Sequence, residues 1–250
     1  MQLSFANKSV VVTGASRGIG LAIALSFAQA GARVAICARG KQGLDAAVAE
    51  IARHGTKVHA DVCNLGDEAS TIRFVTGAAA ALGGIDVLVN NASGGGKGDD
   101  ESAWSAGINV DLLGTVRATR AAVPFLEQSG GGAIVNISSI RGITGSARLP
   151  SYAAVKAAII NYTISEALVL SNSRIRVNAI APGSIEFPGG AWEKRKLEEP
   201  HLYEATVQRI PARRLGTAQE VANVALFLAS DSASWVTGQV IAVDGGQIHT

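Results

Sequence analysis

Apolar residues fall into short continuous runs, separated by longer stretches with a helical pattern. The runs are rich in Val, Ile and Ala and do not alternate with polar residues, which is typical of parallel strands covered on both faces. They predict strands at 8–14, 33–38, 57–62, 85–92, 132–138, 175–181 and 239–245. The intervening stretches predict helices at about 18–31, 41–54, 67–82, 101–127, 152–171 and 218–230. This alternation, with right-handed crossovers, predicts a doubly wound α/β sheet.

The pattern continues without a linker, repeat or low-complexity tract, so residues 1–250 are expected to form a single domain. The longest segment outside the pattern covers residues 184–216. A segment of this length in a compact domain usually has a function. We expect it to be a lid, with residues 186–212 forming most of a substrate pocket.

Composition and charge narrow the class of protein. The chain is 48% hydrophobic and 17% charged, which is enough apolar material for a large core. No apolar run is long enough for a membrane span, and the N-terminus does not resemble a signal peptide. A net charge of +2 without a long basic tract argues against nucleic-acid binding. These features predict a cytoplasmic protein without a membrane partner.

The sequence offers no metal site. The four histidines are scattered, and Cys37 and Cys63 have no metal-ligand spacing. Both cysteines are therefore expected to be free thiols in a reducing compartment.

A glycine-rich stretch follows the first predicted strand. The sequence "TGASRGIG" at residues 13–20 opens the first helix. Gly14, Gly18 and Gly20 would allow a tight turn and a close approach of backbone N–H groups to a pyrophosphate. Their spacing is G-x-x-x-G-x-G, and an ordinary turn is the alternative explanation. The strand before and the helix after favour dinucleotide binding.

The end of the second strand indicates which dinucleotide is bound. The sequence there is "ICARG", with no acidic residue to accept a hydrogen bond from a ribose 2′-hydroxyl. Arg39, together with Arg17, would instead bind a 2′-phosphate through charge-assisted hydrogen bonds. This predicts NADP(H) rather than NAD(H), although two solvated surface arginines are the alternative. Asp61 and Val62, at the end of the third strand, would flank the adenine.

With these features, the chain resembles the classical short-chain dehydrogenase/reductase family. Further matching motifs are "NNA" at 90–92, "NISS" at 136–139, "SYAAVK" at 151–156, "VNAIAPG" at 177–183 and the segment 214–246. The resemblance implies one Rossmann-type sheet of seven parallel strands, a nicotinamide cofactor, often a homotetramer, and hydride exchange between a ketone and a secondary alcohol. It implies cofactor contacts from Gly14, Ser16, Arg17, Gly18, Ile19, Gly20, Arg39, Asp61, Val62, Asn91, Ala92, Ser93, Tyr152, Lys156, Pro182, Gly183 and Ile185.

Tyr152 and Lys156 lie four residues apart and would share one face of a helix. By the resemblance, Tyr152 exchanges a proton with the substrate oxygen, and Lys156 favours the phenolate and holds the nicotinamide ribose. Ser139, thirteen residues upstream of Tyr152, would orient the same oxygen. Ser138 is the competing candidate for that role. The alternative is that Tyr152 and Lys156 are an ordinary i, i+4 pair on a solvent-exposed helix, with no role in chemistry.

Three positions depart from the family pattern. Ser93 stands where the family usually has glycine, and Phe187 stands where a threonine usually binds the nicotinamide carboxamide. Phe187 could cover the nicotinamide instead. The motif "DLLG" at 111–114 puts Asp111 in the place of the family's catalytic asparagine. Asn109 lies about 200° around the helix from it and is not expected to substitute.

Two functions are open at this point. The first is an NADP(H)-dependent oxidoreductase that interconverts a small ketone and a secondary alcohol, with Tyr152 as general acid and base. The second is a cofactor-binding protein with weak or no turnover, a sensor or structural subunit, because Asp111 replaces asparagine. Within the enzymes, enoyl reduction fits less well, because that branch of the family usually spaces its tyrosine and lysine more widely. The 3-oxoacyl-thioester reductases are close relatives by motif.

Overall fold

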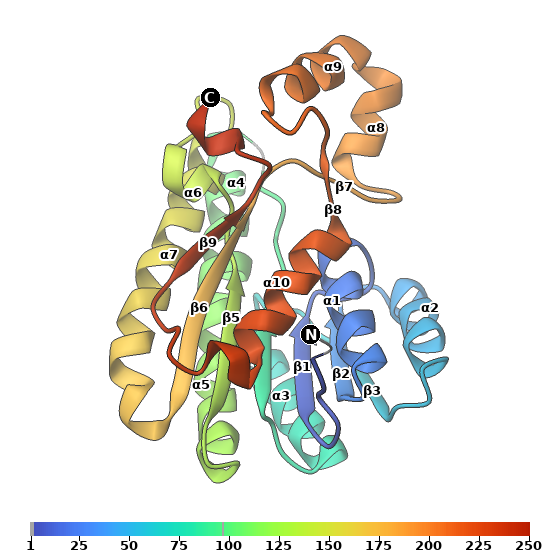
Figure 1. The fold of residues 1–250 in the computed structure, drawn as a ribbon, viewed down its shortest axis with the longest axis vertical. Coiled ribbons are helices and arrows are strands. Elements are labelled where there is room, and N and C mark those ends of the chain that lie inside the picture. Colours follow the sequence, from blue (N-terminus) through green and yellow to red (C-terminus); the bar gives the residue numbers. More distant parts are fainter. Residues whose placement is uncertain (1–2, 97) are drawn as a thin grey trace.

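Seven parallel strands form one sheet in the computed structural model, which describes residues 3–96 and 98–250 (Figure 1). Met1, Gln2 and Lys97 belong to the predicted domain but lie outside the described residues. The order is β3-β2-β1-β4-β5-β6-β9. The bounds are β1 Ser9–Thr13, β2 Arg33–Ala38, β3 Val58–Val62, β4 Val87–Asn90, β5 Gly132–Ile137, β6 Ile175–Pro182 and β9 Val240–Val243. The predicted Rossmann-type fold is confirmed, and each strand ends within two residues of its prediction.

Helices bury both faces of the sheet. Val10 and Val12 of β1 belong to one apolar core, whereas Val11 between them belongs to the other. The first core contains side chains of α1 (Gly18–Gln29), α2 (Lys41–Ala52) and α10 (Ala218–Ala229). The second contains side chains of α3 (Glu68–Leu82), α5 (Leu113–Gln128) and α7 (Pro150–Leu170). Because both sides of each central strand are buried, the strands need no polar alternation.

The helical stretch predicted at 101–127 is present but contains a π-helical turn that was not predicted. The segment consists of α4 (Glu101–Ala106), a π-helical turn at Gly107–Leu112, and α5. The turn lies close to α7, where a Cβ atom added to Gly107 would come 3.1 Å from Val155 Cγ2. Single π turns of this kind are frequent at functional sites. This one contains Asp111, whose side chain is buried.

The predicted lid segment is largely helical. Strands β7 (Ile185–Glu186) and β8 (Gly216–Thr217) pair in parallel at its base. Between them, α8 (Ala191–Glu198) and α9 (Pro200–Arg209) project away from the sheet (Figure 1). The remaining short elements are α6 (Arg141–Thr144) and 3₁₀ turns at Ser171–Ser173, Asp231–Ala233 and Gln247–His249.

Helix α7 and the turn after it, Pro150–Ser173, are long and apolar enough to cross a membrane by length and composition alone. The sequence analysis did not predict this. The helix contains Lys156, whose ammonium group is buried against the sheet, and it supplies side chains to the second core. These are the properties of a core helix, which passes the same test.

Candidate active site

The glycine-rich loop after β1 is shaped by close contact with the end of β4. Gly14 has φ +66°, and a Cβ atom there would lie 2.6 Å from Ala92 Cα. Only glycine fits this position without displacing the neighbouring strand. The Asn91 side chain holds the loop in place, because its amide donates hydrogen bonds to the carbonyls of Thr13 at 3.0 Å and Gly14 at 2.9 Å.

Two cavities lie on either side of this loop, at the carboxyl ends of the strands. We call the one of about 350 Å³ the central cavity and the one of about 170 Å³ the small cavity. Both are lined by Gly14, Arg17, Asn91 and Ser93. Of these two cavities, only the central one is lined by the predicted residues Ile19, Gly20, Ser139, Tyr152, Lys156, Pro182, Gly183 and Ile185. Ser16, Arg39 and Ala92 line only the small cavity.

This arrangement fits a dinucleotide. A loop that only glycine can form opens helix α1 between two adjoining cavities, so its backbone can approach a pyrophosphate closely. The nicotinamide half would then occupy the central cavity and the adenosine half the small cavity.

Gly18, Asp61 and Val62 do not line either cavity. The ring of Phe187 covers Gly18, since a Cβ atom there would come 2.7 Å from Phe187 Cε2. Asp61 Oδ2 lies 2.9 Å from His59 Nε2, and the Val62 side chain is largely exposed. Phe187 therefore packs against the glycine-rich loop while also lining the central cavity.

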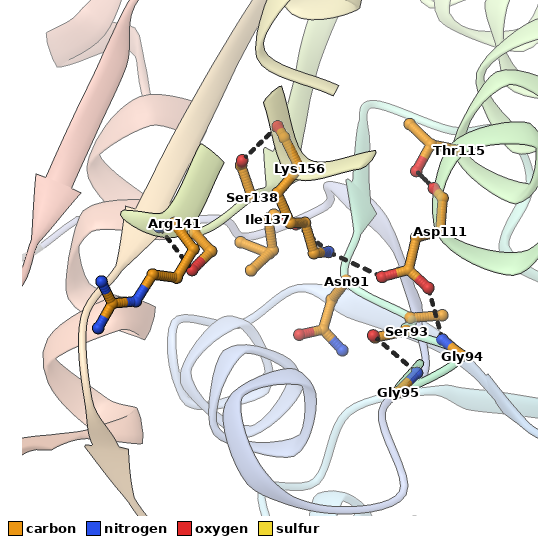
Figure 2. A network of polar contacts seen from close by, with 12 residues as sticks. Asn91, Ser93, Gly94, Gly95, Asp111, Thr115, Ile137, Ser138, Arg141 and Lys156 are labelled. Atoms are coloured by element: carbon orange, nitrogen blue, oxygen red, sulfur yellow. Dashed lines mark hydrogen bonds and ion pairs between the residues drawn. The ribbon is translucent and has the colours of Figure 1, made fainter. Parts of the chain in front are cut away.

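Lys156 is the centre of a buried polar network (Figure 2). Its Nζ donates a hydrogen bond to the Ile137 carbonyl at 3.1 Å and lies 3.1 Å from Asp111 Oδ2. The exposed fractions of the Lys156 and Asp111 side chains are only 3% and 2%. Lys156 Nζ also lies 5.6 Å from the centre of the Tyr152 ring.

The electrostatics of this network keep Lys156 charged. Burial alone would lower the pKa of Lys156, but the charge and hydrogen bond of the Asp111 carboxylate, with a further electrostatic contribution from Tyr152, outweigh burial and raise it.

Asp111 is fixed on three sides. Its Oδ1 accepts a hydrogen bond from the Gly94 N–H at 2.5 Å, and its main-chain carbonyl accepts one from Thr115 Oγ1 at 2.6 Å. Its Oδ2 faces Lys156. Asn109, by contrast, is exposed and donates a hydrogen bond to Ser105 Oγ at 3.1 Å, so it does not replace the carboxylate.

The two adjacent serines after β5 differ in what their hydroxyls do. Ser138 Oγ donates to the Lys156 carbonyl at 2.8 Å and thereby fastens α7 to the sheet. Ser139 Oγ accepts a hydrogen bond from the Arg141 N–H at 3.1 Å, which leaves its own proton available for a ligand. Of the two, Ser139 is the better placed to bind a substrate oxygen.

The sequence did not point to Cys37 and Cys63 as part of the site. Both thiols are free and buried, and both line the small cavity. Burial raises the pKa of Cys37, whereas a hydrogen bond from Cys37 lowers the pKa of Cys63 to about 7. Among residues 3–96 and 98–250, no three His, Cys, Asp or Glu side chains are grouped as a metal site would require.

The sequence also missed a third cavity, of about 610 Å³, that adjoins the central one. Ser139, Gly183 and Trp192 line both. We call it the arginine cleft, because Arg141, Arg148, Arg195 and Arg209 contribute to its walls.

Comparisons with known proteins agree with this geometry. A family model described as enoyl-(acyl carrier protein) reductase matches residues 14–247. The 3-oxoacyl-(acyl-carrier-protein) reductase FabG of Thermotoga maritima is 43% identical over 248 residues, covering 96% of this chain and 98% of that protein. The chain belongs to the classical short-chain dehydrogenase/reductase family, whose members are oxidoreductases acting on alcohol and ketone groups.

Solved structures of the same family superimpose closely. L-sorbose reductase from Gluconobacter frateurii, complexed with NADPH and L-sorbose, has a TM-score of 0.93 and 30% identity, covering 100% of both chains. A 7α-hydroxysteroid dehydrogenase, complexed with NADH and 7-oxo glycochenodeoxycholic acid, has a TM-score of 0.90 and 34% identity, covering 98% of this chain and 96% of that chain.

Proposed function

We propose that the protein is an NADP(H)-dependent oxidoreductase that interconverts a small ketone and a secondary alcohol, with Tyr152 as the general acid and base. The observation that carries the proposal is the convergence of Ser139, Tyr152 and the Lys156–Asp111 pair on one cavity beside the glycine-rich loop. Ketone reduction is favoured over enoyl reduction because Tyr152 and Lys156 lie four residues apart.

The choice of NADP(H) is supported by the small cavity. Arg17 and Arg39 both line it, and no acidic side chain stands at the end of β2. Among the described residues, Arg39 makes no ion pair, so its guanidinium is available to a 2′-phosphate. Solved structures of the protein's family hold either NADPH or NADH, so Arg17 and Arg39 are the feature on which we base the choice of NADP(H).

When bound, the nicotinamide would supply or accept the hydride. Ser139 donates a hydrogen bond to the substrate oxygen and fixes its position. Tyr152 gives that oxygen a proton during reduction and removes it during oxidation. Lys156 stabilises the phenolate through its charge, and the fixed position of its ammonium group keeps this effect constant.

Asp111 acts as a positioning residue through Lys156. It holds the ammonium group at 3.1 Å and partly neutralises its field, which weakens the stabilisation of the phenolate. The pH optimum for alcohol oxidation should therefore be higher in the natural protein than in Asp111→Asn. Superimposable pH–rate profiles would contradict this coupling. An inactive natural form that Asp111→Asn activates would instead support the cofactor-binding alternative.

The proposal also covers the domain organisation, the oligomeric state, the compartment and the partners of the protein. Residues 1–250 form one domain in which residues 184–216 act as the substrate lid. A homotetramer is supported by exposed apolar side chains at Leu168, Val169 and Trp235, which are 75%, 69% and 99% exposed. Free, buried thiols fit the reducing cytoplasm. The partners are small molecules rather than nucleic acid or membrane.

The experiment that tests the proposal is a panel of ketones assayed with NADPH and NADH. We expect oxidation of NADPH with at least one ketone, at a higher kcat/KM than with NADH. Binding of NADPH without turnover of any ketone would contradict the proposed oxidoreductase activity. Equal or better kcat/KM with NADH would contradict the cofactor assignment alone.

A further inference from the structure

We propose that the substrate is an anion: a ketone or alcohol that carries a carboxylate or phosphate group at the end away from the reacting carbon. The arginine cleft would bind that group. The inference rests on the proposed oxidoreductase function and adds the chemical class of its substrate.

The cleft has an excess of positive charge. Its described lining includes Arg141, Arg148, Arg195 and Arg209 but no Asp or Glu side chain. The four arginines come from α6, the segment between α6 and α7, α8 and α9, so they surround the cavity from separate elements. Clefts lined by one sign of charge concentrate ligands of the opposite sign.

Three of these guanidinium groups have no protein partner among the described residues. No hydrogen bond or ion pair joins the side chain of Arg141, Arg148 or Arg209 to another described residue. Only Arg195 has a carboxylate nearby, and its Nε lies 4.0 Å from Glu199 Oε1, at the limit of an ion pair. Figure 2 shows the Arg141 side chain extending away from the Lys156–Asp111 pair, so it does not serve that network.

Acidic side chains near the cleft are already engaged. Glu193 Oε2 accepts the Gly189 N–H at 2.6 Å, and Glu186 pairs with Tyr203 and Lys196. Asp244 accepts the backbone N–H groups of Gly246 and Ile248. In the part of the chain that the structure describes, none of these carboxylates forms an ion pair with Arg141, Arg148 or Arg209.

The junction of the two cavities orients the ligand. Ser139, which would bind the reacting oxygen, also lines the arginine cleft, as do Gly183 and Trp192. A substrate whose carbonyl lies between Ser139 and Tyr152 would extend past Trp192 into the cleft. Guanidinium groups match carboxylate and phosphate oxygens in a bidentate geometry, so an oxyanion at that end is the ligand they would recognise.

The test compares matched acidic and neutral compounds. We would measure kcat/KM with NADPH for 4-oxocyclohexanecarboxylate and its amide, 4-oxopentanoate and its amide, and hydroxyacetone phosphate and hydroxyacetone. A second readout, independent of turnover, is calorimetric binding of cyclohexanecarboxylate and cyclohexanecarboxamide in the presence of NADP⁺. We expect the anion to be preferred by about tenfold or more in at least one pair, and in binding.

Arg148→Gln and Arg209→Gln should each reduce the anion-to-neutral ratio by about tenfold, because each removes a charged hydrogen-bond donor. The matched control is Arg73→Gln, an exposed arginine on α3, which should leave the ratio unchanged.

Ratios near one in every pair, or ratios that the two cleft variants do not change, would overturn the inference. So would a preference for a thioester on an acidic carrier protein over every small anion, because the arginines would then be a docking surface. Failure to oxidise NADPH with any compound would count against the proposed function, while the calorimetry would still test the cleft.

Discussion

The central cavity and the arginine cleft meet at Ser139 but are built in different ways. The central cavity takes its walls from the ends of β5 and β6, the glycine-rich loop, α7 and residues 187–192 of the lid segment, and Lys156 in its lining is paired with Asp111 inside the protein. The cleft takes its charged walls from short helices and a connecting segment outside the sheet, and among the described residues Arg141, Arg148 and Arg209 form no ion pair. In our account, the sheet fixes the reaction chemistry, whereas the attached segments select the substrate.

The largest expected difference between the two regions is in turnover. Tyr152→Phe should reduce kcat by about 10²–10⁴-fold, because it removes the general acid. NADPH affinity, measured by fluorescence titration, should change little because the phenol acts on the substrate. Retention of more than about a tenth of the activity would mean that another group supplies the proton. Arg209→Gln, in the cleft, is the comparison variant and should change KM for an anionic substrate more than kcat.

The buried ion pair should matter far more for stability than the ion pair beside the cleft. Asp111→Leu leaves the Lys156 charge buried without a partner, and we expect a loss of about 3–5 kcal/mol in the free energy of unfolding. Glu199→Gln removes the exposed partner of Arg195 and should cost about 1 kcal/mol or less. Urea denaturation of both variants measures the contrast. Equal effects would show that Lys156 is not stabilised by Asp111.

Cofactor preference should respond to a single side chain at the small cavity. Arg39→Asp removes a charged donor and repels a 2′-phosphate, so kcat/KM with NADPH should fall about 10–100-fold relative to NADH. Arg53→Asp, at the end of α2, is the control for a charge change at an exposed arginine outside either cavity. If Arg39→Asp leaves the ratio of kcat/KM with NADPH to kcat/KM with NADH unchanged, Arg39 does not bind the cofactor.

The smallest effect concerns the base of the lid. Glu220 completes a capping box with Thr217 at the start of α10, and it pairs with Arg214. The hydrogen bond from Arg214 lowers the pKa of Glu220 to about 2 from its usual 4.5. A carboxylate with a depressed pKa stabilises the fold above pH 4.5, and this contribution is lost as pH falls from about 4.5 to 2.

Because the Glu220 side chain is 38% exposed, solvent reduces the benefit to about 1 kcal/mol or less. Glu220→Gln should lower the thermal midpoint slightly at pH 7 and make no difference at pH 2. An equal loss at both pH values would mean that charge is not involved.

The strands could be predicted well from the sequence because both faces of the sheet are buried. Val10, Val11 and Val12 lie in an uninterrupted apolar run, and each is fully buried on one face or the other. Ser139, Tyr152 and Lys156 are named because their motifs resemble those of the family, not from the strand pattern. Their roles stay predictions.

Features that depend on distant contacts could not be predicted. The π turn at Asp111 contacts residues that are remote in sequence: Asp111 faces Lys156, and Gly107 lies close to Val155. The contact of the Phe187 ring with Gly18 joins residues that are remote in sequence, and whether Phe187 also covers the nicotinamide stays a prediction. The four cleft arginines belong to separate elements, and no local pattern connects them.

The most direct test of the central claim is isotope transfer. NADPH labelled with deuterium on one or the other face of C4 of the nicotinamide, in two separate preparations, would be incubated with the protein and the ketone panel, and the products analysed by mass spectrometry. We expect deuterium on the carbinol carbon with the natural protein and about 10²–10⁴-fold less with Tyr152→Phe. If the natural protein binds NADPH but transfers no deuterium to any ketone from either face of the nicotinamide, it is not the oxidoreductase described here.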